Sequence, residues 1–119
     1  MVSIIGTTDL PLGNVDVEAF VEDLGERGRV ALGLPPGLRS VYLVPLPTEY
    51  TTKKDGYDIT FVAYSAPGKT VEQKREFVKV LNDVVQERDW GGPAKVVVII
   101  KEHDAENVGV GGVLRLDMS

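Results

Sequence analysis

The chain has one histidine, and its position suits proton-transfer chemistry. His103 follows an apolar run at 96–100 that predicts a strand, and loops at strand ends often carry functional side chains. An ordinary surface histidine is the alternative interpretation. Asp104 and Glu106 lie close by in the sequence, but these groups form only a weak metal-binding pattern, so we predict no metal site.

Several other kinds of site are excluded by residue type or context. The chain has no cysteine, which rules out disulfides, thiolate catalysis and cysteine metal ligands. A single histidine also rules out a multi-histidine metal site within one chain. The Gly-Val-Gly-Gly segment at 109–112 does not lie between a strand and a helix, so it is not a phosphate-binding loop. We therefore expect no cofactor.

Length and charge restrict the partners. A chain of 119 residues with 43% hydrophobic residues fits one globular domain. Its net charge is -5 and it has no basic run, so we expect binding neither to nucleic acid nor to a membrane surface. No apolar stretch approaches the roughly 20 residues of a membrane span. The first six residues do not resemble a signal peptide, and we expect a cytoplasmic protein.

The apolar pattern predicts two successive β-α-β units. The elements are a strand at 2–5, a helix from 15 toward 34, strands at 40–44 and 57–64, a helix from 70, and a strand at 95–101. Gly25 and Gly28 weaken the first predicted helix. The second is the clearer prediction, because Thr70 and Gln73 form a capping box before an apolar stripe.

These elements predict an α/β (α+β) fold with a four-stranded mixed sheet and both helices on one face. The first unit and its connection span residues 1–56, and the second, with a glycine-rich C-terminal ribbon, spans 57–119. The run at 96–100 is apolar throughout, which is typical of a strand covered on both faces. Because both helices cover one face, we expect a second subunit to cover the other.

The second unit resembles 4-oxalocrotonate tautomerase. The resemblance runs from about residue 58 to 112, and is carried by Gly-Lys-Thr-Val-Glu-Gln-Lys at 68–74, Val-Ile-Ile-Lys-Glu at 98–102 and Glu-Asn-Val-Gly-Val-Gly-Gly at 106–112. The first unit matches in layout, with Gly-Leu-Pro-Pro at 33–36 as its best point. The whole chain therefore resembles the fused tautomerases, in which two units share one polypeptide. This resemblance implies a homotrimer.

The resemblance also implies a particular chemistry, from which this sequence departs. Tautomerases use an N-terminal proline whose amine, held in an apolar pocket, has a lowered pKa and acts as general base or acid. Here position 2 is Val2. Val108 stands where relatives often carry an aromatic residue, and Val97 where the short tautomerases place an arginine. Lys69 matches a cationic loop position of several relatives, and Arg39 is a plausible second cation.

Two functions remain open at this stage. The first is cofactor-independent proton transfer on a small α-keto acid or carbonyl compound: tautomerisation, hydration or decarboxylation. Its candidate catalytic residues are Val2 (through a free amine), Lys69, Arg39 and His103, and its candidate substrate-binding residues are Lys69, Arg39, Asn107 and Val108. The second is a non-catalytic binding or assembly subunit, in which these residues are ordinary strand and loop positions. A hetero-oligomer in which another chain supplies the proline is a further alternative.

Overall fold

The computed structural model describes residues 1–118 and contains one four-stranded sheet with two helices. The strands are β1 (Val2–Thr8), β2 (Arg39–Pro45), β3 (Tyr57–Ser65) and β4 (Ala94–Glu102). The helices are α1 (Val17–Ala31) and α2 (Val71–Gln86). The strand order is β2-β1-β3-β4, parallel within each unit and antiparallel between β1 and β3. The predicted fold class is confirmed.

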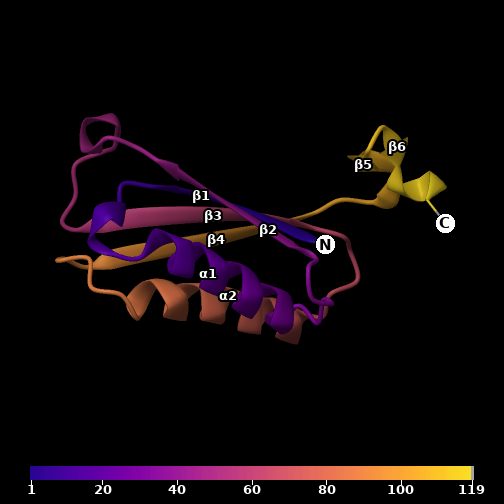
Figure 1. Cartoon of the computed structure of the whole chain (residues 1–119), viewed down its shortest axis with the longest axis horizontal. Helices are drawn as coiled ribbons and strands as arrows, with labels where there is room; N and C mark the ends of the chain where they lie inside the picture. The colour runs from indigo at the N-terminus through magenta and orange to yellow at the C-terminus, as the bar shows by residue number, and fades with distance from the viewer. Residues whose placement is uncertain (119) are drawn as a thin grey trace.

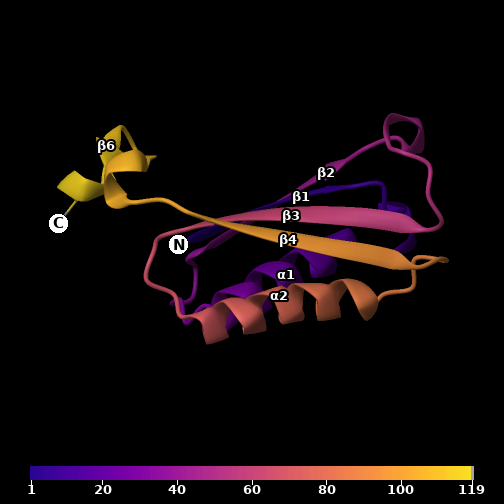
Figure 2. The ribbon, with the colours of Figure 1, turned by 180° about the vertical axis from the view of Figure 1, so that it is seen from behind.

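Both helices cover the same face of the sheet, as Figures 1 and 2 show from opposite sides. Alternate residues of the strands point into the core between sheet and helices, because side chains on a strand have a period of two. In β3 these are Ile59, Phe61 and Ala63, all fully buried. They pack with α2 residues such as Phe77 and Leu81 in one apolar cluster.

Gly25 and Gly28 have low helix propensity, but both allow close packing of α1. The helix runs unbroken through both positions and ends at Ala31. A Cβ atom at Gly25 would lie 3.1 Å from Arg39 Cδ, and one at Gly28 would lie 3.1 Å from Phe77 Cε1. These glycines therefore allow α1 to pack closely against β2 and α2.

The predicted capping box of α2 is present. The Gln73 N–H donates to Thr70 Oγ1 at 3.0 Å, and the Thr70 N–H donates to Gln73 Oε1 at 2.8 Å. This pair satisfies two amide groups that the first helical turn leaves without partners.

The two units repeat one another down to single hydrogen bonds. The N–H of Val2, at the start of β1, donates to Leu38 O at 3.1 Å, just before β2. The N–H of Tyr57, at the start of β3, donates to Pro93 O at 2.8 Å, just before β4. Val2 and Tyr57 are therefore equivalent positions.

The chain after β4 forms an arm that projects beyond the sheet, which Figure 1 shows in yellow. We call residues 103–118 the C-terminal arm. It contains a short hairpin of β5 (Gly109–Val110) and β6 (Val113–Leu114), where the sequence predicted a ribbon and a final strand. The arm gives the chain a radius of gyration of 15.3 Å, above the value of about 13.5 Å typical of this length.

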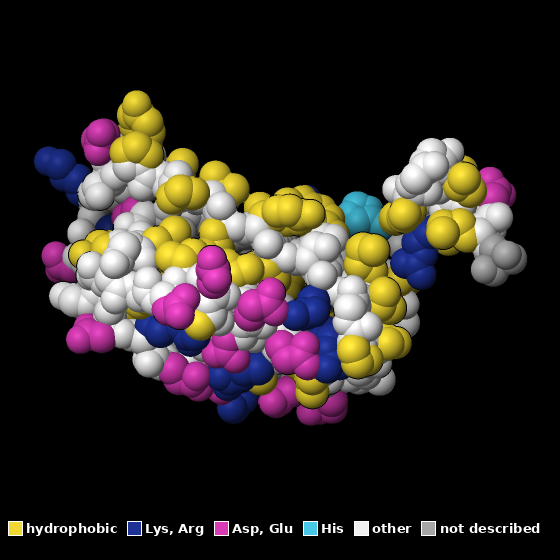
Figure 3. Space-filling view, viewed as in Figure 1, with side chains coloured by type: hydrophobic (Ala, Val, Ile, Leu, Met, Phe, Trp, Pro, Cys, Tyr) yellow, Lys and Arg dark blue, Asp and Glu magenta, His cyan; other side chains and the backbone are white. Residues whose placement is uncertain are grey.

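The sheet face away from the helices is open and largely apolar. We call it the open face; its apolar side chains are Ile5, Tyr42, Val44, Val62, Val97 and Ile99. In Figure 3 hydrophobic side chains gather along the sheet side of the molecule and charged side chains over the helices. Among residues 1–118, no helix combines the length and apolar character needed to cross a membrane.

Candidate active site

A cavity of about 230 Å³ lies between the start of β1 and the C-terminal arm. It is mostly apolar, with several polar groups among its walls. Its lining residues are Met1, Ser3, Tyr64, Ser65, Ala66, His103, Val108, Val110, Arg115 and Met118. This volume is below that of typical drug-sized sites, so the cavity suits a small ligand.

The antiparallel pairing of β1 and β3 assembles this cavity. Ser3 faces Tyr64 across the sheet and Val2 faces Ser65, so the start of β1 meets the end of β3. The parallel β4 ends beside β3, and the N–H of His103 donates to Ser65 O at 2.9 Å. The first strand, the β3–α2 loop and the start of the arm therefore converge at one sheet edge.

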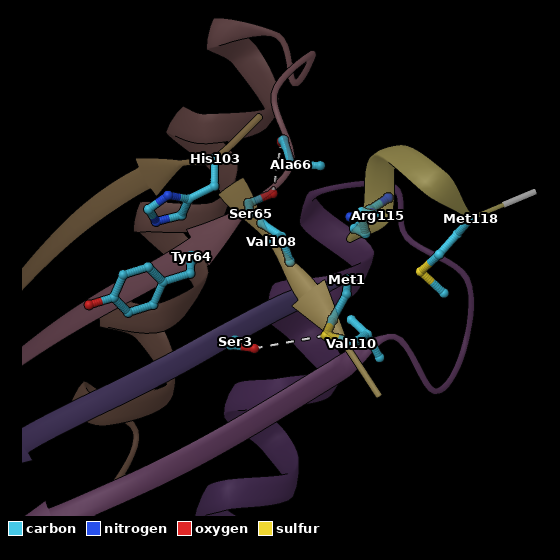
Figure 4. A pocket seen from close by; sticks show the side chains of 10 residues that line it. All are labelled: Met1, Ser3, Tyr64, Ser65, Ala66, His103, Val108, Val110, Arg115 and Met118. Carbon is cyan, nitrogen blue, oxygen red and sulfur yellow. Dashed lines mark hydrogen bonds between the residues drawn. The ribbon is translucent and has the colours of Figure 1, made fainter. Parts of the chain in front are cut away.

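His103 stacks on Tyr64 at the edge of the cavity. Their ring centroids are 5.5 Å apart and the planes are inclined by 21°. Figure 4 shows these two rings on one side of the cavity, Arg115 and Met118 on another, and Met1 between them. The stack orients the imidazole at the edge of the cavity.

The amine of Met1 lies in a cationic, partly desolvated environment. Burial lowers the pKa of this amine below its ordinary value of about 8, and the charges of Lys69 and Arg115 lower it further. All three effects disfavour the protonated form. A larger fraction of this amine is therefore unprotonated at neutral pH than at an ordinary chain terminus.

Lys69 lies next to the cavity on the β3–α2 loop. Its Nζ donates to the carbonyl of Ala66 at 3.4 Å, and no carboxylate lies within ion-pair distance among residues 1–118. Its charge is therefore available to an anionic ligand or to a carbonyl oxygen.

The second unit also matches a known family. Residues 64–116 match the family model described as Tautomerase enzyme. This part of the chain is similar to a tautomerase unit. The match begins at Tyr64 and ends just beyond Arg115, so it includes most of the residues that line the cavity. No curated protein matches the sequence significantly.

Solved structures show that the whole chain has the fold of fused tautomerases. It is similar to a fused 4-OT asymmetric trimer, with TM-score 0.75, 19% identity and 96% of each chain covered. A fused 4-OT symmetric trimer gives TM-score 0.78 and 15% identity, covering 96% of this chain and 98% of that one. Malonate semialdehyde decarboxylase gives TM-score 0.68 and 21% identity, with 90% of each chain covered.

The structure brings some of the predicted site residues of this tautomerase-like chain together. His103 and Val108 line the cavity, and Lys69 lies beside it. The Val2 side chain is fully buried on the helix side, so only the backbone of this residue approaches the cavity. Asn107 lies in a turn whose N–H donates to Asp104 O, and it is not among the lining residues.

Arg39 lies elsewhere, on the helix side of β2. Its guanidinium pairs with Glu22 and lies 3.6 Å from a carboxylate oxygen of Glu26, both on α1. Arg39 shares a strand face with Val41, which packs against the core, so the alternation of β2 directs it toward α1. Arg39 therefore contributes no positive charge to the cavity.

The second cation at the cavity is Arg115, which was not among the residues selected from the sequence. It belongs to the C-terminal arm, where a turn places its side chain in the cavity wall. Tyr64, Ser65 and Ser3 were likewise not selected. The antiparallel register of β1 and β3 brings these residues to the cavity, and a search of the sequence for motifs does not predict that register.

A second cavity lies at the opposite edge of the sheet, where β1 ends and β3 begins. Its walls are Thr7, Thr8, Asp9, Leu46, Thr51, Thr52, Lys54, Asp58, Thr60 and Val62. The buried Asp9 carboxylate accepts from Lys54 Nζ at 2.6 Å and from the Asp58 N–H at 2.9 Å. Burial alone would raise the pKa of Asp9, but these donors outweigh it and hold the pKa below its usual value. The Asp9 carboxylate and the Lys54 ammonium group pair with each other, so we assign both residues a structural role.

Proposed function

We propose that this protein catalyses cofactor-independent proton transfer on a small α-keto acid or related carbonyl compound. One observation carries the proposal: an amine with a lowered pKa lies in a small, mostly apolar cavity beside two cations that lack carboxylate partners among residues 1–118. An amine in this state can take a proton, and the cations favour negative charge on the substrate.

The reaction needs one base and one cation. The neutral Met1 amine removes a proton from the carbon next to the substrate carbonyl. The electron pair of the broken C–H bond forms a C=C bond, and the π pair of the C=O bond moves to the oxygen. Lys69 donates to this developing oxyanion and stabilises it. The protonated amine then returns the proton to the oxygen or to another carbon, which completes a tautomerisation.

Other groups of the cavity complete the proposal. Val108 contributes to the apolar wall that lowers the pKa of the amine. His103, fixed by its stack on Tyr64, is the alternative proton carrier. Hydration or decarboxylation would use the same cations, and the similar malonate semialdehyde decarboxylase is described with decarboxylase and hydratase activities.

A non-catalytic binding or assembly subunit is the second candidate function. It is favoured by the backbone at Val2, the position that replaces the family's proline. The Val2 N–H donates to Leu38 O, and its side chain is fully buried. In this role the cavity would hold a ligand without transforming it.

A keto–enol assay with phenylpyruvate, and a second with 2-hydroxymuconate, tests the proposal. We expect Lys69→Ala to reduce kcat/KM roughly a hundredfold, because it removes the donor to the oxyanion. Lys79→Ala is the matched control, since Lys79 is exposed on α2 and pairs with Asp83. Wild-type protein with no rate above buffer on either compound would favour the non-catalytic function.

The amine itself needs a separate experiment. Intact mass identifies the residue that carries it, Met1 or Val2. We expect a Gly-Ser extension before Met1 to reduce the rate at least a hundredfold, because the base is displaced from the cavity. An extended protein with full activity would transfer the role of base to His103, which His103→Gln then tests.

We also propose a homotrimer as the active assembly. The similar fused 4-OT structures are trimers, and the open face presents apolar side chains that a neighbouring subunit would cover. The cavity lies at the edge of this face, because Ser3 and Tyr64 belong to it.

A further inference from the structure

An ion pair joins the first turns of α2 to the last residue of β4, beside the cavity. Lys74 Nζ lies 2.9 Å from Glu102 Oε1, and the two side chains are 30% and 34% exposed. Two other cations of α2, Arg75 and Lys79, pair with carboxylates of their own helix. The Lys74–Glu102 pair instead links two elements that both lead directly into the cavity walls.

Glu102 lies beside the start of the loop that carries Lys69. In the parallel register of β3 and β4 it is the partner of Ser65, so both side chains lie on the face that the helices cover. Ser65 is the last residue of β3, and the β3–α2 loop with Lys69 follows it. A Glu102 carboxylate released from Lys74 would therefore lie next to this loop as a counter-charge for Lys69.

Such a counter-charge would act on the amine of the cavity. Burial lowers the pKa of the Met1 amine, and the positive charges of Lys69 and Arg115 lower it further. No carboxylate lies within ion-pair distance of either cation among residues 1–118. A carboxylate paired with Lys69 would cancel part of this effect, because opposite charges at short distance compensate each other.

We propose that Lys74 is a positioning residue of this site: by pairing with Glu102 it keeps that carboxylate away from Lys69. The inference deepens the proposed function and takes the role of the amine from it. Lys74 acts here through Glu102 and Lys69 and needs no contact with a substrate. A partly exposed ion pair contributes little to stability, so its main effect should be on the charge of the cavity.

Other charged groups near the cavity could act on the amine as well. They belong to the end of β3, the β3–α2 loop, the start of α2, the end of β4 and the arm: Tyr64, Lys69, Glu72, Arg75, Lys101, His103, Asp104, Glu106, Arg115 and Asp117. A test must therefore separate the pairing of Lys74 with Glu102 from the summed charge of this region. A double-mutant cycle does so, because independent charges add and coupled ones do not.

The pKa of the terminal amine, measured by NMR, tests the role of Lys74 without a substrate. A ¹³C label at Cα of the residue that intact mass finds at the terminus reports the protonation of the amine. The cycle consists of Lys74→Gln, Glu102→Gln and the double variant. Lys79→Gln is the matched control, because it removes the same charge from α2 and breaks a pair with Asp83 instead.

We expect Lys74→Gln to raise the pKa of the amine by roughly half a pH unit, because the released carboxylate neutralises Lys69. Glu102→Gln alone should change this pKa by less than about 0.2 pH unit, because Lys74 already neutralises Glu102. The double variant should return to within about 0.2 pH unit of wild type, because no carboxylate remains to be released. Lys74→Arg keeps the pair, and both it and Lys79→Gln should titrate as wild type does.

Two results would overturn the role of Lys74. An unchanged pKa in Lys74→Gln would show that Glu102 does not reach Lys69. An equal shift on Glu102→Gln with and without Lys74 would show that the two charges act independently. Circular dichroism checks that each variant is folded, and a shifted pKa in folded Lys74→Arg would also contradict the role. Failure of the proposed function has another appearance, since the cycle would then give these pKa values while phenylpyruvate and 2-hydroxymuconate show no turnover.

Discussion

The environment of the Met1 amine is the feature on which the proposed chemistry depends. Position 2 is Val2, and the Met1 amine lies near the apolar side chains of the cavity and near the charges of Lys69 and Arg115. Desolvation and neighbouring positive charge act in the same direction on a cationic group, so both lower its pKa. In the proposed reaction a primary amine would therefore act as base without a proline ring.

The pH profile of kcat/KM should report this pKa. We expect the rate to rise with pH as the amine loses its proton, with a midpoint below about 8. Lys69→Ala and Arg115→Ala each remove a positive charge that disfavours the protonated amine, so the midpoint should move to higher pH in both. Lys79→Ala should leave it in place. An unchanged midpoint in all three variants would contradict an amine base between these cations.

The sequence indicated part of this site at the level of single residues. His103 and Val108 line the cavity, and Lys69 lies beside it. Arg39 was a candidate by residue type. Its side chain lies on the helix side of β2, and the sequence alone does not show which face of β2 packs against the helices. Arg115 could not be selected, because its position depends on the path of the arm after β4.

At the scale of elements, the start of β3 is fixed by a close approach to Pro93. Gly56 has a φ of +79°, and a Cβ atom there would lie 2.3 Å from the carbonyl oxygen of Pro93. That carbonyl accepts the N–H of Tyr57, the bond that begins the pairing of β3 with β4. Only glycine fits both the backbone conformation and the contact.

Substitution of Gly56 should therefore destabilise the fold. We expect Gly56→Ala to lower the free energy of unfolding by about 3 kcal/mol, from an unfavourable φ and an overpacked contact. Gly37→Ala is the matched control. Gly37 has a φ of +87° and no atom lies within 4 Å of the place that a Cβ atom would take, so this change should cost only about 1 kcal/mol. Urea unfolding measures both, and equal losses would show that the Pro93 contact relaxes freely.

Most of the elements could be predicted because their signals are local. The capping box of Thr70 and Gln73 and the stripe that follows are readable in 16 residues of sequence, and α2 begins where they predict. The end of α1 was predicted too late, toward 34, because Leu32 and Leu34 continue the apolar pattern. In the structure the helix ends at Ala31, and Gly33 follows with a φ of +69°.

At the scale of the whole molecule, the open face presents exposed apolar side chains that the proposed trimer would cover. Tyr42 is 59% exposed on β2 and Ile99 is 44% exposed on β4, the two outer strands of the sheet. The strand at 96–100 alternates between the two faces, with Val96 and Val98 toward the helices and Val97 and Ile99 toward the open face. The apolar run at 96–100 therefore contributes side chains to both the core and the open face.

A charge on the open face should break the assembly. We expect wild-type protein to have three times the 12.9 kDa mass of the chain in light scattering, and Ile99→Lys to shift it toward the monomer. Val78→Lys is the control, because Val78 is comparably exposed at 39% but lies on α2. A wild-type protein that stays monomeric at micromolar concentration would contradict the trimer.

Val2 and Tyr57 are equivalent positions at opposite ends of the sheet, and each N–H donates to a carbonyl, Leu38 O or Pro93 O. The residue before Val2 is Met1, whereas the residue before Tyr57 is Gly56, in the middle of the chain. Met1 and Met118 line one cavity, so a designed linker could join these two residues. A circular permutant joined there and reopened before Gly56 would carry its free amine beside Asp9 and Lys54. The duplicated architecture thus offers two equivalent positions at which a designed chain could begin.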